Sequence, residues 1–364
     1  MKYVIISTYP EKGSKNVGDQ LISTSTINAI KYCKGKHCQI KTIWRAEKWE
    51  EVKDEIQDAD AVIFACLAIR KNMDVREYPY LQQLVDSKIS FGIIAAGTSL
   101  PVSSDAENIF SGFSENVLKQ LQELNARALF FTTRGYLTQS FCVHYDLNNA
   151  EFSGDISFFD ERFSHRKFIQ NFEIRKIAIS DPHYGKYYLN SLDLLIHQLR
   201  YLFPLAELTI LLHGINPVIE EYCQRNSVKY HKIYSNEGKG IDIYDSVHLH
   251  VGYRIHGHVA ALNRRLPSYL LEQDGRGQDY GLTIGKKISV PSYIHKTSDN
   301  RTKSFIKKML QKNVDSKFVS LNPVYAITAM INEDAKNGFE KFLGLEKQIL
   351  NFNDLCLKAI KKLP

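Results

Sequence analysis

An arginine and a histidine stand where a predicted strand gives way to a predicted helix in HVGYRIHGHVAALNRRLPSYLLEQDGRG, residues 250–277. The strand ends near Val251, Gly252 permits a tight turn, and Arg254 and His256 follow at the start of the helix. Because the free N–H groups of a helix N-terminus attract anions, this segment would hold a phosphate or a carboxylate. The structural alternative is that Arg254 pairs with a neighbouring acid and His256 only caps the helix.

A second arginine follows a predicted strand in the first half of the chain. In FFTTRGYLTQSF the strand ends at Thr132, and Arg134 comes two residues later. Taken singly, this position is typical of a solvated or capping arginine. Ligands of α/β sheets bind outside the carboxyl ends of the strands, so Arg134 and Arg254 together would form a two-sided clamp for a small dianion.

The first loop combines a small residue with a carboxylate. It is NVGDQLI, residues 16–22, and it follows the first predicted strand. Gly18, next but one to Asn16, would let the backbone pass close to a ligand. Asp19 either caps a helix that begins near Gln20 or accepts a proton from a hydroxyl group.

A further aspartate occupies a comparable position in FSGDISFF. Asp155 follows Gly154 after a short predicted strand. Aspartate in this context usually accepts backbone hydrogen bonds from the next turn, so we expect Asp155 to be a capping residue.

Four histidines raise the question of a metal site. They are His248, His250, His256 and His258. No carboxylate follows at ligand spacing and the four fall on different elements, so we expect no metal. The six cysteines include no CxxC pair, which favours reduced, mostly buried thiols.

The charge of the chain limits its partners. A formal net charge of +7 is compatible with an anionic substrate, an anionic glycan or a membrane surface. No arginine-rich tract or aromatic-basic interleaving is present, so we expect no nucleic-acid partner. The N-terminal apolar run is too short for a signal sequence, and no stretch approaches the length of a membrane span, so we expect a cytoplasmic protein.

Residues 286–317 are rich in lysine and poor in acids. Such a run is usually a solvated face. The functional alternative is an electrostatic contact area for an anionic glycan, or for lipid-linked acceptors at the inner membrane leaflet. This would make the protein peripherally membrane-associated.

Apolar runs of strand length alternate with helical patterns, which predicts parallel sheets built from βαβ units. Strands are expected in the first half at residues 3–7, 39–43, 61–64, 91–95, 129–132 and 151–152. A helix is expected within residues 107–124. The second half should repeat the pattern, with strands at 177–180, 208–212, 229–230, 249–251 and 268–271 and helices at 188–202, 217–224, 241–246 and 257–263.

The chain should therefore form two Rossmann-like α/β domains that face each other across a cleft. We predict domains at residues 1–165, on the acceptor side, and 166–325, on the donor or anion-binding side, followed by a helical segment at 326–364. Apolar residues from Phe342 to Leu363 alternate at steps of three and four, which predicts a long helix. This stripe is too short for a sustained heptad array, so we expect it to pack on the protein itself rather than on a coiled-coil partner.

The segments above resemble those of the polysaccharide pyruvyl transferase family, whose members have a two-domain fold of the GT-B type. The matching pieces are NVGDQLI, TTRGYLTQSF, FSGDISFF and YRIHGHVAALNRRLPSYLL, in order and spacing over roughly residues 1–290. Where the family usually has a glycine-rich turn after the third strand, this chain has FACLAIRKNMD. Where the family often has a lysine after the final strand, EQDGRGQDYGLTIGKK leaves Lys286 or Lys287 as counterparts.

The resemblance implies transfer of a pyruvyl group from phosphoenolpyruvate to a sugar of a polysaccharide or lipid-linked glycan precursor, forming a ketal and releasing phosphate. His256 would be the acid or a phosphate-neutralising donor, Asp19 the base or a hydroxyl-orienting group, and Arg254 a third catalytic residue. The substrate-binding residues would be Asn16, Gly18, Arg134, Asp155, Gly252, Gly257 and Lys286. No cofactor or metal would be needed.

Two other functions remain open from the sequence. A GT-B glycosyltransferase with a nucleotide-sugar donor would also use a helix N-terminus and an arginine, with Glu272 as a candidate reader of the ribose. A non-catalytic glycan-binding relative could keep the same scaffold, and the absent glycine-rich turn favours it.

Overall fold

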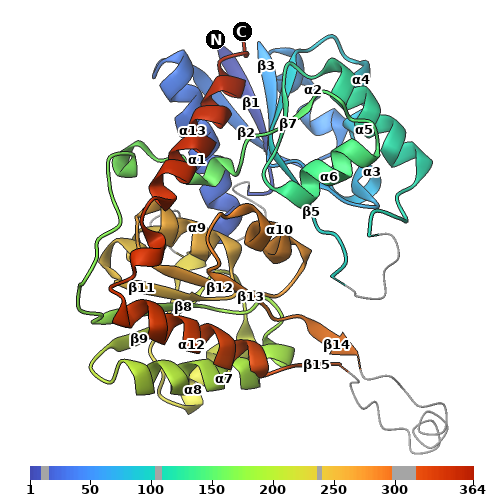
Figure 1. Cartoon of the computed structure of the whole chain (residues 1–364). Coiled ribbons are helices and arrows are strands. Elements are labelled where there is room, and N and C mark those ends of the chain that lie inside the picture. The colour runs from blue at the N-terminus through green and yellow to red at the C-terminus, as the bar shows by residue number, and fades with distance from the viewer. Residues whose placement is uncertain (10–15, 103–108, 236–239, 297–316) are drawn as a thin grey trace, which may run out of the picture.

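The computed structural model describes residues 1–9, 16–102, 109–235, 240–296 and 317–364. Each half of the chain folds around one parallel sheet, and the two units are stacked one above the other (Figure 1). We call them the first and second domains. This is the pair of Rossmann-like domains that the alternating pattern predicts.

The first sheet has the strand order β2-β1-β3-β5-β6-β7, with β4 paired to β5. The strands are β1 (Lys2–Ser7), β2 (Gln39–Trp44), β3 (Ala61–Ala65), β4 (Ala68–Ile69), β5 (Phe91–Thr98), β6 (Phe131–Thr133) and β7 (Ala150–Phe152). Its helices are α1 (Val17–Lys34), α2 (Trp49–Gln57), α3 (Met73–Arg76), α4 (Leu81–Asp86), α5 (Glu115–Arg127) and α6 (Tyr136–His144). Apolar side chains alternate between the faces of β1, so one face packs on α1 and the other on α2, α4, α5 and α6.

The second sheet has the order β10-β9-β8-β11-β12-β13. Its strands are β8 (Lys176–Ser180), β9 (Glu207–Leu212), β10 (Tyr230–Lys232), β11 (Leu249–Gly252), β12 (Ser268–Glu272) and β13 (Ser289–Pro291). The helices are α7 (Gly185–Leu202), α8 (Pro217–Arg225), α9 (Ile255–Asn263), α10 (Gly275–Thr283) and α12 (Asn322–Lys336). A small antiparallel pair, β14 (Ile294–Lys296) and β15 (Lys317–Val319), projects beside this sheet (Figure 1).

The predicted strands are all present, but two predicted helices differ. The helix predicted at 107–124 begins only at Glu115, because Gly112 has φ +84° and Ser114 caps the helix by accepting a hydrogen bond from the Val117 N–H group. Residues 107 and 108 lie outside the described residues. Residues 241–246 form a 3₁₀ turn, Gly240–Ser246.

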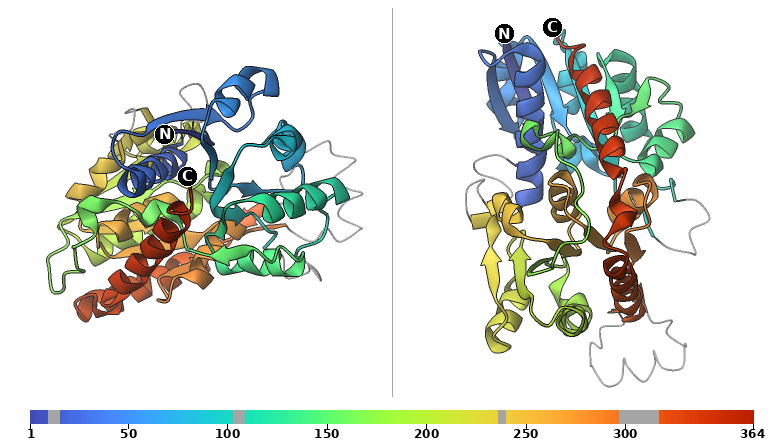
Figure 2. Two further views of the ribbon diagram at one scale, coloured as in Figure 1. Left: turned by 90° about the horizontal axis from the view of Figure 1, so that it is seen from above. Right: turned by 60° about the vertical axis from the view of Figure 1, so that its left-hand side comes forward.

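The C-terminal apolar stripe is divided between two elements. Phe342 ends a short 3₁₀ turn, Gly344 has φ +81°, and α13 runs over Leu345–Ile360. As predicted, the stripe packs on the protein itself: Ile349 and Phe352 lie in the core of the second domain. Helix α13 then returns to the first domain, where it lies beside α1 near both chain ends (Figure 2).

The predicted domain limits at residues 165 and 325 fall between β7 and β8 and within α12, respectively. Helix α12 packs on α7 and β12 of the second domain, whereas α13 contacts β5 and β6 of the first. The predicted C-terminal segment thus contributes to both domains.

Candidate functional site

The two sheets turn the carboxyl ends of their strands toward a shared cavity of about 590 Å³. The first domain lines it with residues that follow β1, β3, β5 and β6, and the second with residues that follow β8, β9, β11 and β12. Side chains of opposite domains therefore meet at one place, as expected for paired α/β sheets.

Arg134 follows β6 and lines this cavity. The residue is only 9% exposed, yet its guanidinium makes no ion pair or hydrogen bond with any described residue, and its Nε is buried without a partner. Burial alone would lower the pKa of Arg134, but the Tyr280 phenol and the Asp155 carboxylate, with smaller contributions from other neighbours, outweigh it and raise the pKa. The guanidinium carbon lies over the Tyr280 ring, 5.9 Å from its centroid. A buried cation without an anionic partner among the described residues is costly, so this position favours an anionic ligand.

Arg254 reaches the same cavity from the second domain. Its Nε donates to Asp181 Oδ1 at 3.0 Å and its Nη2 to Asp181 Oδ2 at 2.8 Å, while its backbone N–H donates to the Ser180 hydroxyl at 3.1 Å. The ion pair that the sequence offered as an alternative is therefore present. It orients the guanidinium at the N-cap position of α9 and leaves Arg254 on the cavity wall.

His256 lies in the first turn of α9 and also lines the cavity. Its Nε2 is buried and has no hydrogen-bond partner among the described residues. Burial lowers the pKa of His256, and the Asp155 and Asp19 carboxylates only partly oppose this. The imidazole is therefore neutral at pH 7 until a negative charge is added beside it.

The first loop brings α1 into the second domain. Asn16 is the N-cap of α1, since its side chain accepts a hydrogen bond from Gly18 N at 2.9 Å. Of the two roles left open for Asp19, the structure does not support capping, because Asn16 is the cap and the helix begins at Val17. Val17 is buried against second-domain residues, and its N–H donates to the His213 carbonyl at 3.1 Å.

Asp19 and Asn16 both line the cavity, whereas Gly18 packs against His256. A Cβ atom at Gly18 would overlap the imidazole ring. Glycine at this position therefore allows close approach to a side chain of the other domain. The sequence-based interpretation expected that approach to be toward a ligand.

Asp155 is buried, and it caps a 3₁₀ turn as predicted by accepting from Ser157 N at 2.7 Å. Its other oxygen accepts from the Tyr280 hydroxyl of the second domain. Burial would raise the pKa of Asp155, but His256, Arg134 and these two hydrogen bonds lower it overall. Asp155 does not line the cavity and acts on the cavity residues through its charge.

Three other predicted binding residues do not contact the cavity. Gly252 and Gly257 are packing positions, because a Cβ at Gly252 would overlap Ser180 and one at Gly257 would lie 2.7 Å from the Tyr244 hydroxyl. Lys286 lies between α10 and β13, away from the cavity-lining residues.

Of the four clustered histidines, His248, His250 and His258 make structural contacts outside the cavity. Ser268 Oγ lies 2.7 Å from both His250 Nδ1 and His258 Nδ1, so the two buried rings share one hydroxyl. His248 accepts backbone N–H bonds from Arg175 and Lys176. Throughout the described part of the chain, no group of three or more metal-type side chains gathers.

Sequence reasoning missed His213 and Arg276, which also line the cavity. His213 Nε2 lies 2.8 Å from the Tyr244 hydroxyl, and its Nδ1 is buried without a partner. Arg276 pairs with Asp274, the N-cap of α10, at 2.5 Å. Both residues follow second-domain strands, and this position was the only signal that could have identified them.

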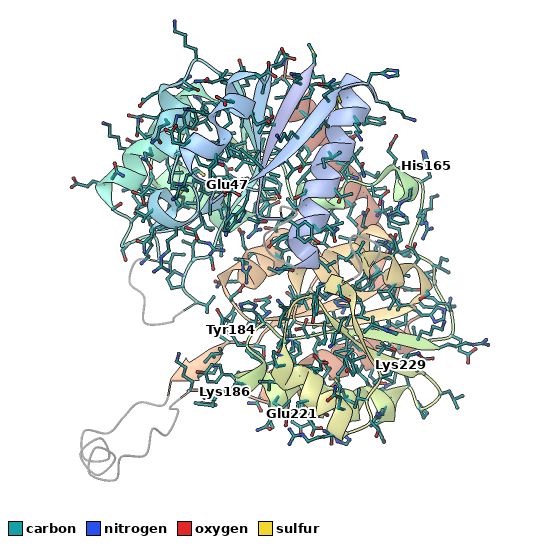
Figure 3. The ribbon with its side chains drawn as sticks, turned by 180° about the vertical axis from the view of Figure 1, so that it is seen from behind. Glu47, His165, Tyr184, Lys186, Glu221 and Lys229 are labelled. Carbon is teal, nitrogen blue, oxygen red and sulfur yellow. The ribbon has the colours of Figure 1, made fainter. Side chains whose placement is uncertain are left out.

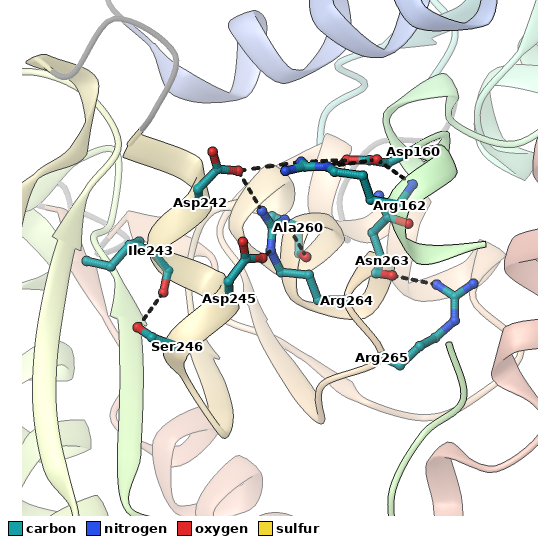
Figure 4. Close-up of polar contacts among 10 residues, drawn as sticks. All are labelled: Asp160, Arg162, Asp242, Ile243, Asp245, Ser246, Ala260, Asn263, Arg264 and Arg265. Carbon is teal, nitrogen blue, oxygen red and sulfur yellow. Dashed lines mark hydrogen bonds and ion pairs between the residues drawn. The ribbon is translucent and has the colours of Figure 1, made fainter. Parts of the chain in front are cut away.

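The far end of α9 is fixed by a charged cluster (Figure 4). Arg264, at the C-cap, donates to Asp245 at 2.5 Å and to Asp242 at 3.1 Å, and Arg162 of the interdomain connection also reaches Asp242 at 3.5 Å. Because Arg264 is buried, these bonds restrain the helix that carries His256 at its other end.

Solved structures show what the fold resembles. The structure of MnaA from S. aureus with UDP aligns with 96% of this chain and 94% of its own, at a TM-score of 0.50 and 9% identity. UDP-GlcNAc 2-epimerase from Neisseria meningitidis, bound to UDP-GlcNAc, aligns with 93% of this chain and 100% of its own at a TM-score of 0.49 and 12% identity. The likeness to MnaA shows the two-domain GT-B arrangement and nothing of the ligand.

Sequence comparison is more specific. No curated protein sequence gives a significant match. Residues 16–275 match polysaccharide pyruvyl transferase, and this range holds the first loop, Arg134, Asp155, Arg254 and His256. Because the match spans well over half of the chain, the chain belongs to the polysaccharide pyruvyl transferase family.

Proposed function

We propose that the protein transfers a pyruvyl group from phosphoenolpyruvate to two hydroxyl groups of a sugar residue in a glycan or glycan precursor. The observation that carries the proposal is Arg134: its buried guanidinium has no ion pair with any described residue, and it lies in the same cavity as Arg254 and the N-terminus of α9. A phosphate and a carboxylate held close together on one small molecule would match these donors.

Family membership supports the class of reaction, and the buried polar atoms support the place of the donor. His213 Nδ1, His256 Nε2 and Arg134 Nε are buried without partners in the part of the chain that the structure describes, and all three residues line the cavity. Tyr244 has no other acceptor among the described residues, so its hydroxyl donates to His213 Nε2 and leaves Nδ1 as an N–H donor. We assign the donor's anionic groups to these three residues and Arg254.

The proposed transfer takes place in two steps. A sugar hydroxyl oxygen bonds to C2 of phosphoenolpyruvate while C3 gains a proton and becomes a methyl group. A second hydroxyl then adds at C2 and loses its proton as the bond between C2 and the phosphate oxygen breaks, which gives the ketal and inorganic phosphate, and the phosphate carries this proton away. The first step needs a proton donor at C3 and a base at the hydroxyl.

His256 is suited to be the proton donor. It is neutral in the free protein, and a dianion bound beside it would raise its pKa and load it with a proton. Asp19 is suited to be the base, because its carboxylate lines the cavity and, since Asn16 is the cap, has no capping role.

The structure offers no specific support for the nucleotide-sugar alternative. Glu272, the candidate residue for binding the ribose, accepts hydrogen bonds from the Ser289 hydroxyl at 2.6 Å and the Tyr293 hydroxyl at 2.9 Å. It does not line the cavity. The non-catalytic alternative predicts that neither donor binds.

Titration of the protein with phosphoenolpyruvate and with nucleotide sugars, followed by calorimetry and thermal shift, tests the three functions. We expect phosphoenolpyruvate to bind. Arg134→Gln should lower the affinity for phosphoenolpyruvate at least about tenfold, since a hydrogen bond to a charged group contributes roughly 1.5 to 3 kcal/mol. Arg225→Gln, on the exposed surface of α8, should leave the affinity unchanged. Binding of a nucleotide sugar without phosphoenolpyruvate would reject pyruvyl transfer.

A lipid-linked acceptor at the inner leaflet of the membrane, approached from the cytoplasm, remains a prediction. Most of the lysine-rich run, residues 297–316, lies outside the described residues. Among those that are described, no helix is both long and apolar enough to cross a membrane. Binding to anionic liposomes that falls as salt is added would support peripheral association.

A further inference from the structure

The cavity contains a second group of cations that donor binding does not use. Arg45, Arg70 and Lys71 line its first-domain side, and we call them the outer cationic wall. Arg45 follows β2, while Arg70 and Lys71 follow β4. Figure 3 labels Glu47, two residues after Arg45, on the first domain and Tyr184, another cavity residue, on the second.

One short segment holds both arginines of this wall. Arg45 lies over the Tyr78 ring, with its guanidinium carbon 5.9 Å from the ring centroid. Arg70 Nη1 pairs with Glu77 at 3.2 Å. Since Glu77 and Tyr78 are adjacent and both buried, the two arginines are directed to the same part of the cavity.

The positive charge of this wall is mostly uncompensated. Glu77 is the single carboxylate that pairs with it among the described residues, and Arg45 and Lys71 have no ion pair there. Among the described residues, the carboxylates that line the cavity are Asp19 and Asp274, and Asp274 already pairs with Arg276. A concentration of like charge in a concave site attracts an anion.

The strand that precedes Arg45 is also separate from the strand that precedes Arg134, whereas Arg70 and Lys71 follow β4, which pairs with β5 next to β6. In the strand order β2-β1-β3-β5-β6, Arg45 and Arg134 follow strands four steps apart, which corresponds to roughly 19 Å at the usual strand spacing. Asp19 follows β1, between them. The donor is a three-carbon molecule, so it cannot contact both ends of this cavity.

Apolar side chains accompany the wall. Ile69, Ile109 and Phe113 line the cavity beside Lys71, and a Cβ atom at Gly112 would lie 2.5 Å from Lys71 Nζ. An aromatic ring next to cations suits a sugar, which offers a C–H face to the ring and an anionic substituent to the guanidinium groups.

We infer that the acceptor is an anionic sugar whose negative group, a phosphate or a carboxylate, is bound by Arg45, Arg70 and Lys71. This inference rests on the proposed function, because only a transferase has an acceptor. The sugar would lie over Phe113, and its reacting hydroxyl groups would point toward Asp19 and the donor. The acceptor would thus be recognised by charge at one end and by the reaction at the other.

Binding of three related probes tests the inference: glucose, glucose 1-phosphate and glucuronic acid, measured by ligand-observed NMR with and without phosphoenolpyruvate. We expect at least one anionic probe to bind the wild-type protein roughly tenfold or more tightly than glucose. The double variant Arg45→Gln/Lys71→Gln should remove this preference, and these two side chains are chosen because neither holds an ion pair. A stronger response to the phosphate or to the uronic acid identifies the anionic group.

Two controls separate the possible failures. Lys119→Gln, on the outer surface of α5 and 74% exposed, should keep the preference. The affinity for phosphoenolpyruvate should remain within about twofold in the double variant, because loss of donor binding there would show that the wall holds the donor and would overturn this inference. Absence of phosphoenolpyruvate binding by the wild-type protein, with the preference for an anionic probe retained, would count against the proposed function and not against this inference. Equal binding of neutral and anionic probes by the wild-type protein, or equal loss of both in the double variant, would overturn it.

Discussion

Asp279 of the second domain caps α6, the first-domain helix Tyr136–His144. Its carboxylate accepts hydrogen bonds from the N–H groups of Leu137 at 2.8 Å and Thr138 at 3.3 Å, and from the Thr138 hydroxyl at 2.7 Å. Helix α6 has Gly135 at its own N-cap position and no side-chain cap. Because α6 directly follows Arg134, the second domain stabilises the turn that positions this arginine.

We expect Asp279→Ala to destabilise the protein by about 2 kcal/mol or more, since loss of a cap costs roughly 1 to 2 kcal/mol and these N–H groups are also buried. Urea unfolding followed by fluorescence measures this. Asp58→Ala, which removes an exposed pair with Lys2, should change stability by less than about 0.5 kcal/mol. Equal effects of the two substitutions would contradict a capping role for Asp279.

Asp19→Asn separates chemistry from folding in the first loop. Since Asn16 caps α1, the substitution should leave the free energy of unfolding within about 0.5 kcal/mol, whereas loss of a general base should lower turnover by about a hundredfold to ten-thousandfold. Release of phosphate in the presence of acceptor is the measurement. Asn16→Ala should show a loss of stability of about 1 kcal/mol. Normal turnover in Asp19→Asn would exclude Asp19 as the base.

Gly18→Ala should impair catalysis through His256. The added Cβ overlaps the imidazole ring, so the ring must shift, and we expect turnover to fall to a level near that of His256→Gln. Gly214→Ala is the matched control, because a Cβ there meets nothing within 4 Å and the residue lies next to His213. If Gly18→Ala and Gly214→Ala were equally active, contact between the first loop and His256 would have no catalytic importance.

The buried histidines should make the protein sensitive to acid. Burial lowers the pKa of His258 to about 3, whereas in the unfolded chain it titrates near 6.5. Between these values the unfolded state binds more protons, so the free energy of unfolding falls as the pH drops, by about 2 kcal/mol at pH 5 for this residue. His258→Asn should flatten the dependence between pH 7.5 and 5, and the exposed His197→Asn should not. A slope that both variants leave unchanged would show that His258 does not control it.

The sequence predicts the two sheets well because each strand is an apolar run of the right length between helical patterns. Ile5 and Ile63 illustrate this, since both lie in runs that are buried on both faces and neither depends on a distant polar partner. The convergence of Arg134 and Arg254 was predictable for the same reason: each follows a strand, and the fold class fixes where strand ends meet.

Contacts between domains could not be predicted in this way. No helix was predicted around Asp279, and nothing in the sequence indicates that its side chain contacts α6. The buried position of Val17 depends on a second-domain surface that is built from several elements. Cys66 shows a related limit. It has φ +57° at the position where the family has its glycine-rich turn, a backbone conformation that only the surrounding packing can impose on a side-chain-bearing residue.

The return of α13 to the first domain has a consequence for the order in which the protein can fold on the ribosome. Cys356 and Ile360 complete the core against Ile94, so the part of this sheet face that α1 does not cover stays open until residues that follow the whole second domain have been synthesised. The first domain is thus begun first and finished last. Until then the nascent chain carries an exposed apolar sheet face, which is the kind of surface that chaperones bind.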